Sequence, residues 1–169
     1  SYAIGAAGST GVTVGIAKFR PSNEAVTLQK VGLTLTNGTF AGASGAQDLV
    51  NVYLYNGSTL LGTAVFTGNA TTATSTLSQT LNLPKDTDTL ITIKADLADI
   101  CTSCPGTEGD LVKIDVADFE GAGVSSGTTI RGGNSAGLSA VAGVRLFNTF
   151  PTVALVSLPS TAISGGKLM

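Results

Sequence analysis

The feature that most constrains the fold is a two-residue alternation of apolar with small or polar side chains. Near the start of the chain, Val12, Val14 and Ile16 are separated by Thr13 and Gly15. Successive side chains of a β-strand point to opposite faces, so this period predicts strands with one buried face. Such strands are expected at residues 12–19, 25–36, 50–55, 60–66, 72–83, 90–95, 111–116, 128–130 and 141–147.

The composition also favours strands over a helical bundle. Only 12% of the residues are charged, against roughly 25% in an average protein, and small and β-branched residues, which fit a pleated sheet, take their place. About nine strands with almost no helix predict an all-β, two-sheet sandwich with Greek-key connections and extended terminal strands. The expected organisation is an N-terminal extended segment over 1–10, the sandwich over 11–150, and a C-terminal extended strand or linker over 151–169.

A β-bulge is predicted in the second strand. Val26 and Leu28 share one parity of this strand, whereas Val31 and the apolar residues after it share the other. A one-residue shift exchanges the two faces of a strand, so one extra residue near Gln29–Lys30 would return both sets to the core.

A β-hairpin is predicted at Asn56-Gly57, which separates the apolar strand at 50–55 from the one at 60–66. Both central residues of a type I′ turn have positive φ, a conformation that Asn and Gly adopt more readily than other residues. The pair therefore predicts a tight turn between two neighbouring strands.

What the chain lacks excludes several classes of function. It has no His, which excludes Ser-His-Asp and Cys-His catalysis within one chain, and no Trp to stack on sugars or cations. Its net charge is −2 and its 9 Lys and Arg are scattered, so no basic surface for nucleic acid is expected. No apolar run approaches the roughly 20 residues that cross a bilayer. The sequence predicts a non-catalytic protein with no cofactor and no membrane span.

Cys101 and Cys104 are the two cysteines of the chain. A redox centre would need the first of them at a helix N-terminus, but Pro105-Gly106 follows at once and ends any helix. A zinc site would need four ligands, which two Cys and no His cannot supply. We expect a small disulfide that pins a loop, consistent with an oxidising, extracellular compartment.

Acidic residues offer one metal hypothesis. Asp115, Asp118 and Glu120 lie close together in the sequence, and oxygen ligands at such spacing could hold Ca²⁺. They match no EF-hand loop, so the alternative is that these carboxylates are solvated and have no metal role.

The two chain ends are candidate assembly segments. Pro151 and Pro159 bracket an apolar stretch and make it a discrete unit. An extended terminal segment can add to a neighbour's sheet, where backbone hydrogen bonds give affinity and alternate side chains fill pockets. The alternative is that each end folds back onto its own domain. The candidate assembly residues are Thr152, Val153, Leu155, Val156 and Leu158 at one end and Tyr2 and Ile4 at the other.

Short motifs follow one another along nearly the whole chain: Val12–Phe19, Asn23–Leu28, Val52–Ser58, Pro84–Asp88, Ile93–Asp96 and Pro151–Leu155. In this order they resemble the immunoglobulin-like modules of large secreted bacterial surface proteins. The resemblance implies an immunoglobulin-like sandwich in a tandem or polymeric surface array, with the tail passing toward the next module and no catalytic residues. The cysteine loop is not part of this pattern. The tail is also loosely similar to the donor strands of pilins.

Two functions stay open at this point. The first is an extracellular structural subunit that assembles with copies of itself, through terminal strand donation, into a pilus-like filament or a surface layer. The second is a monomeric adhesin-like module whose loops at 38–45 and 121–137 bind a glycan or protein receptor. Removal of 151–169 or of 1–10 should abolish assembly in the first case.

Overall fold

The computed structural model describes residues 2–35, 45–133, 142–149, 151 and 153–154. Within these ranges the protein is all-β, as predicted, with eleven strands and a single short 3-10 turn, η1 (Ala46–Asp48). The strands are β1 (Ala3–Ala6), β2 (Val12–Phe19), β3 (Val26–Leu35), β4 (Leu49–Asn56), β5 (Thr59–Ala64), β6 (Thr72–Leu83), β7 (Thr89–Leu97), β8 (Leu111–Val112), β9 (Ile114–Gly123), β10 (Thr129–Gly133) and β11 (Val144–Phe147).

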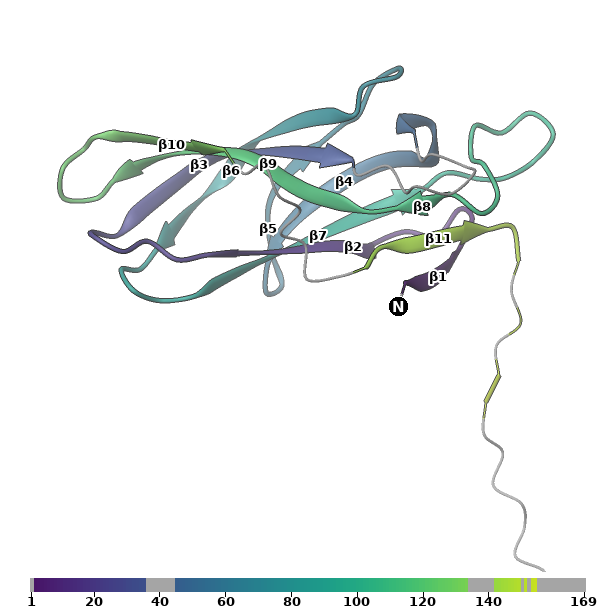
Figure 1. Ribbon diagram of the computed structural model, residues 1–169, viewed down its shortest axis with the longest axis horizontal. Coiled ribbons are helices and arrows are strands. Elements are labelled where there is room, and N and C mark those ends of the chain that lie inside the picture. Colours follow the sequence, from purple (N-terminus) through teal and green to yellow (C-terminus); the bar gives the residue numbers. More distant parts are fainter. Residues whose placement is uncertain (1, 36–44, 134–141, 150, 152, 155–169) are drawn as a thin grey trace, which may run out of the picture.

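The strands are arranged as a sandwich of two layers (Figure 1). One layer is the four-stranded sheet β2-β7-β4-β5, and the other contains the four-stranded sheet β10-β9-β3-β6. A small sheet, β1-β11-β8, lies beside them, and Lys113 alone separates β8 from β9. All ladder pairs are antiparallel except β1 with β11.

The core lies between the layers and is built from the alternating apolar side chains. Val14 on β2, Leu54 on β4 and Ile93 on β7 are fully buried from one sheet, and Leu28 and Leu33 on β3 are fully buried from the other. Burial of such side chains is the main favourable term in folding, at about 25 cal/mol per Å² of apolar surface. Apolar residues therefore recur at every second position because those side chains point into the interior between the two layers.

The predicted bulge on β3 is confirmed. The register of β3 shifts between Leu28 and Lys30 against both of its neighbours, β6 and β9. Against β9 the extra residue is Gln29, whereas against β6 the extra residues lie on β6. Leu28 before the shift and Val31 after it are both fully buried.

The predicted hairpin is also present, but its turn lies one residue later than expected. Asn56 pairs with Thr59, so the turn residues are Gly57 and Ser58. Gly57 has a φ of 58°, while Asn56 and Ser58 are not among the residues with positive φ. This is the pattern of a type II′ turn and not of type I′. Asn56 stays in the strand because its side-chain amide donates a hydrogen bond to the carbonyl of Leu90 on β7, at 3.0 Å.

The N-terminal residues belong to a sheet of their own chain. β1 runs parallel to β11, with Ala3 opposite Val144 and Ala6 opposite Phe147. At the other end of the chain, the described residues Pro151, Val153 and Ala154 lie outside every strand.

The sandwich has two ends along its long axis (Figure 1). We call the left-hand one the turn end, because the connections at 20–25, 84–88 and 124–128 gather there. We call the right-hand one the exit end, because β11 finishes there beside the loops at 7–11 and 98–110. The chain therefore leaves the sandwich at the end opposite to the three turns.

Candidate functional site

The N-terminal assembly candidates lie on an edge strand that is already paired. The N–H groups of Ala3 and Ala7 donate hydrogen bonds to carbonyls at the two ends of β11, at 3.0 and 2.8 Å. Tyr2 packs its ring against the guanidinium of Arg145, 4.7 Å from the ring centre. Tyr2 and Ile4 are about half exposed, at 51% and 49%. One side of this strand's backbone is therefore already paired within its own chain, and the side chains of Tyr2 and Ile4 are partly exposed.

The C-terminal candidates differ in this respect. Val153 is 94% exposed, which is the largest exposure among the described large apolar residues. Thr152, Leu155, Val156 and Leu158 lie outside the described residues. The part of this segment that the structure describes begins outside its own sandwich.

Cys101 and Cys104 form a disulfide, as predicted. The bond closes a tight turn at the exit end, in which the N–H of Cys104 donates to the carbonyl of Cys101 at 3.1 Å. Cys101 is exposed and Cys104 half-buried. A disulfide with neither a helix N-terminus nor a basic neighbour at the turn fits a structural role.

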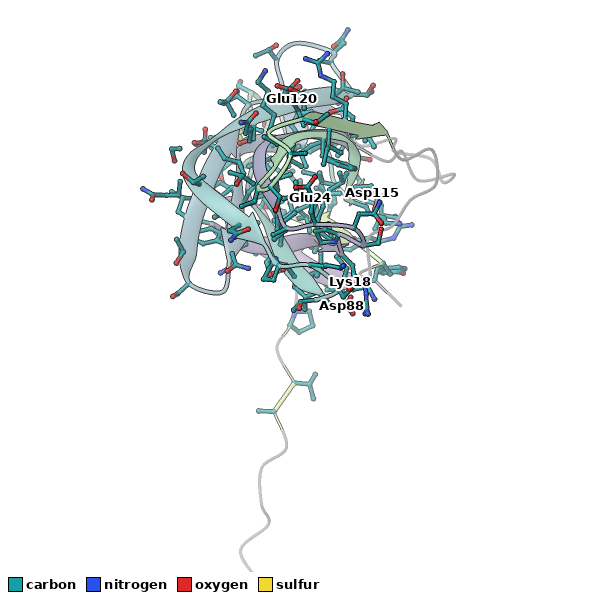
Figure 2. All side chains as sticks on the ribbon, turned by 90° about the vertical axis from the view of Figure 1, so that its left-hand side faces the viewer. Lys18, Glu24, Asp88, Asp115 and Glu120 are labelled. Carbon is teal, nitrogen blue, oxygen red and sulfur yellow. A yellow bond between two sulfur atoms is a disulfide. The ribbon has the colours of Figure 1, made fainter. Side chains whose placement is uncertain are left out.

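The structure does not bring the three calcium candidates together. Asp115 is buried and forms an ion pair with Lys113, at 3.6 Å. Glu120 forms ion pairs with Lys30 of β3, at 3.3 Å, and with Arg131 of β10, at 2.8 Å. Asp118 is exposed. Figure 2 shows Asp115 and Glu120 well apart. Throughout the described ranges, no three Cys, Asp or Glu side chains are grouped so that they could hold a metal ion.

A buried pair of carboxyl groups was not foreseen from the sequence. Asp48, at the end of η1, and Asp110, just before β8, are 0% and 1% exposed. The Asp48 carboxylate accepts hydrogen bonds from the N–H groups of Gly45 and Thr107, both at 2.9 Å. Burial raises the pKa of Asp110 to about 6; the charge of Asp48 and a hydrogen bond with it act in the same direction, and Arg145 opposes them.

This acid pair stabilises the loops at the exit end of the sandwich. Asp48 connects η1 to the loop at 98–110, since its carbonyl also accepts a hydrogen bond from the N–H of Ala98 at 2.9 Å. Because Asp48 and Asp110 are inaccessible, they cannot meet a substrate, although two adjacent carboxyls are a common catalytic arrangement. No local pattern could have revealed the pair, because its members lie in connections far apart in the sequence.

An apolar groove is the second feature that sequence reasoning missed. It has a volume of about 430 Å³ and lies at the turn end, between β2 of one layer and β9 and β10 of the other. We call it the β2–β10 groove. Phe19 and Phe119 meet edge to face in it, with ring centres 5.8 Å apart. Its lining is Ala17, Lys18, Phe19, Arg20, Pro21, Ser22, Asn23, Glu24, Val26, Leu83, Val116, Phe119 and Ile130.

The charged side chains at the rim of this groove have partners within the chain. Lys18 and Arg20 both pair with Asp88, at 3.1 and 3.3 Å, and Figure 2, which looks onto the turn end, shows Lys18 beside Asp88. Glu24 accepts hydrogen bonds from the hydroxyl and N–H of Ser126, at 2.6 and 3.0 Å, and these bonds hold its pKa below the usual value. The rim is therefore fixed, while the floor is apolar.

Comparisons of the chain with protein-family models, with curated proteins and with solved structures find no match. In the part of the chain that the structure describes, no helix has the length and apolarity needed to span a membrane. The function is therefore argued from the sandwich, its two ends and the groove.

Proposed function

We propose that this chain is a non-catalytic, extracellular structural subunit with an immunoglobulin-like fold. Copies of it assemble into a filament or a surface layer, and the C-terminal segment of one copy adds to the sandwich of the next. The protein's main partner is therefore itself.

The strand pairing supports the immunoglobulin-like assignment. In that fold, strands B, E and D share one sheet and C, F and G share the other. The order β2-β7-β4 corresponds to B-E-D, and the pairs β3-β9 and β8-β11 correspond to C-F and F-G. β1 then takes the place of a first strand that runs parallel to the last one.

The observation that carries the proposal is the exposure of Val153 just after the last strand. The sequence that follows continues with Leu155, Val156 and Leu158 before Pro159. An apolar stretch gains free energy when it leaves water, and an extended one can do so by joining a neighbouring sheet. Since β1 is already paired in its own chain, the C-terminal segment is the better candidate for the donor.

Two further properties support an extracellular assembly. The disulfide between Cys101 and Cys104 suits an oxidising compartment. Only 12% of the residues are charged, so copies of the protein repel each other less than ordinary soluble domains do.

The test compares three chains: the full chain, a chain without residues 151–169, and a matched control without 160–169, which keeps the apolar stretch. Sedimentation velocity and negative-stain microscopy report assembly, and denaturant unfolding reports the fold. We expect the full chain and the control to assemble and the shortest chain to be a folded monomer. A full chain that is monomeric at high concentration would overturn the proposal. Removal of 1–10 is a poorer test, because it takes β1 out of its sheet.

A monomeric adhesin-like module is the second candidate function. The observation that favours it is the β2–β10 groove, because its volume of about 430 Å³ is that of a small-ligand site. A full chain that stays monomeric and binds a glycan or protein receptor on an array would favour this candidate.

A further inference from the structure

We infer that the β2–β10 groove is the acceptor site for residues 153–158 of a second copy, so that subunits join turn end to exit end. This inference rests on the proposed function and adds to it the place where the donated segment binds.

The groove offers both elements of a strand-accepting site. Among the described strands, β10 pairs only with β9 and lies at an edge of its sheet. The edge of a sheet presents N–H and C=O groups that can pair with an added strand. Beside this edge, in the groove, lie the apolar side chains of Phe19, Phe119 and Ile130. An incoming strand would therefore meet backbone partners and an apolar floor together.

The C-terminal segment has the composition that this site requires. Residues 153–158 carry no charge, and Ala154, Val156 and Leu158 share one parity. One face of the extended segment is therefore entirely apolar and can fill the groove. Lys18 and Arg20 at the rim already pair with Asp88, so an uncharged occupant leaves neither cation without a partner.

The lengths also agree. The prolines at 151 and 159 leave seven residues between them that can pair as a strand. An extended segment of this size spans about 23 Å at 3.3 Å per residue. β10 has 5 residues, so the segment is long enough to pair along its whole edge.

The position of the chain exit indicates that the occupant comes from another copy. β11 ends at the exit end, and the groove lies at the turn end (Figure 1). Val153, which follows this exit, is 94% exposed. A contact between the exit end of one copy and the turn end of the next is heterologous, and such contacts generate rings or open filaments rather than closed dimers.

The test places a charge in the groove of the full chain. In Ile130→Glu the half-buried groove residue becomes acidic, and the matched control Thr129→Glu places the same charge on the neighbouring, exposed residue of β10. Circular dichroism verifies the fold, and sedimentation velocity measures association. We expect Ile130→Glu to weaken association at least tenfold and Thr129→Glu to leave it within about twofold of the unmodified chain.

The outcomes separate this inference from the proposed function. An Ile130→Glu chain that assembles as the unmodified chain does would overturn the acceptor site and leave the structural role intact. An unmodified chain that does not assemble at all defeats the structural role itself.

A cross-linking experiment covers the case in which Ile130→Glu fails to fold. A chain carrying Ile130→Cys is mixed with a chain carrying Val156→Cys under mild oxidation, with Thr129→Cys as the control. We expect a disulfide between the two different chains for Ile130→Cys and at least fivefold less for Thr129→Cys. If a chain with both Ile130→Cys and Val156→Cys instead closes the bond within itself, even when diluted with unmodified chain, the second-copy assignment is wrong.

Discussion

The backbone of Gly15 on β2 lies directly against the carbonyl oxygen of Ile114 on β9, and a Cβ atom on Gly15 would collide with that oxygen. The two layers of the sandwich touch backbone to backbone here, and the β2–β10 groove opens further along β2, toward Phe19. Gly15 does not have the positive φ that favours glycine. Space rather than backbone conformation therefore requires a glycine at this position.

We accordingly expect Gly15→Ala to lower the free energy of unfolding by about 1–3 kcal/mol, the usual cost of overpacking an interior. The matched control is Gly133→Ala on β10, where an added Cβ would find its nearest neighbour at 3.7 Å, an ordinary contact. Urea unfolding of both variants measures the difference. Equal stabilities would show that the layers can separate at Gly15 without cost.

The buried acid pair predicts a stability that falls as the pH rises toward neutrality. The pKa of Asp110 is raised from 3.8 to about 6 in the folded chain. Between these values the folded state binds more protons than the unfolded state, so this group's contribution to the free energy of unfolding decreases from pH 4 to pH 6. Above pH 6 the buried charge is fully present and the cost persists.

Asp110→Asn should remove this pH dependence, because the amide stays neutral and can still donate a hydrogen bond to Asp48. At pH 7.5 we expect the variant to be more stable than the unmodified chain by about 1.5–3 kcal/mol, the scale of a hydrogen bond to a charged group. Thermal unfolding from pH 4 to pH 8 is the measurement, with the exposed Asp118→Asn as the control. A profile for Asp110→Asn that is unchanged from that of the unmodified chain would contradict the prediction.

The disulfide should contribute modestly, because the loop between Cys101 and Cys104 is very short. In the chain-entropy description the stabilisation grows with loop length, and for so small a ring it is at most about 2 kcal/mol. We expect the double variant Cys101→Ser/Cys104→Ser to keep its fold and to unfold at slightly lower urea concentration. Reductant should shift the unmodified chain to the same midpoint. Complete unfolding on reduction would refute this view of the loop.

The contact between Tyr2 and Arg145 should help to hold β1 in place. An exposed cation–π contact contributes about 0.5–1 kcal/mol, so Tyr2→Ala should speed amide exchange along Ala3–Ala6 by about two- to fivefold. Tyr2→Phe keeps an aromatic ring and is the matched control, with exchange close to that of the unmodified chain. If both variants exchange alike, the backbone ladder alone holds the strand.

Much of the local structure could be predicted from the sequence, because it is encoded in neighbouring residues. The alternation along β2 and β3 located both strands, and the change of parity after Leu28 located the bulge. The turn after Asn56 was placed one residue too early, because a hydrogen bond to Leu90, far along the chain, keeps Asn56 in the strand. The exact position of this turn thus depends on a contact with a distant segment, which the local sequence pattern does not contain.

The buried acid pair and the β2–β10 groove likewise depend on interactions between distant segments. Asp48 and Asp110 are unremarkable acidic residues in the sequence and become a pair only when η1 meets β8. Likewise, Phe19 and Phe119 carry no signal that they line one groove. The calcium candidates show the same limit: the ladder between β9 and β3 sets Asp115 opposite Thr34 and Glu120 opposite Lys30, and each carboxylate forms ion pairs of its own.

The parallel pairing of β1 with β11 determines how this module would respond to mechanical load. The chain enters at the start of β1 and leaves at the end of β11, and these two points face opposite ways along one ladder. When the two ends are pulled apart, the strands are drawn past each other lengthwise, and their hydrogen bonds share the load at once instead of opening singly. A filament made of such units would resist stretching at the ladder between β1 and β11.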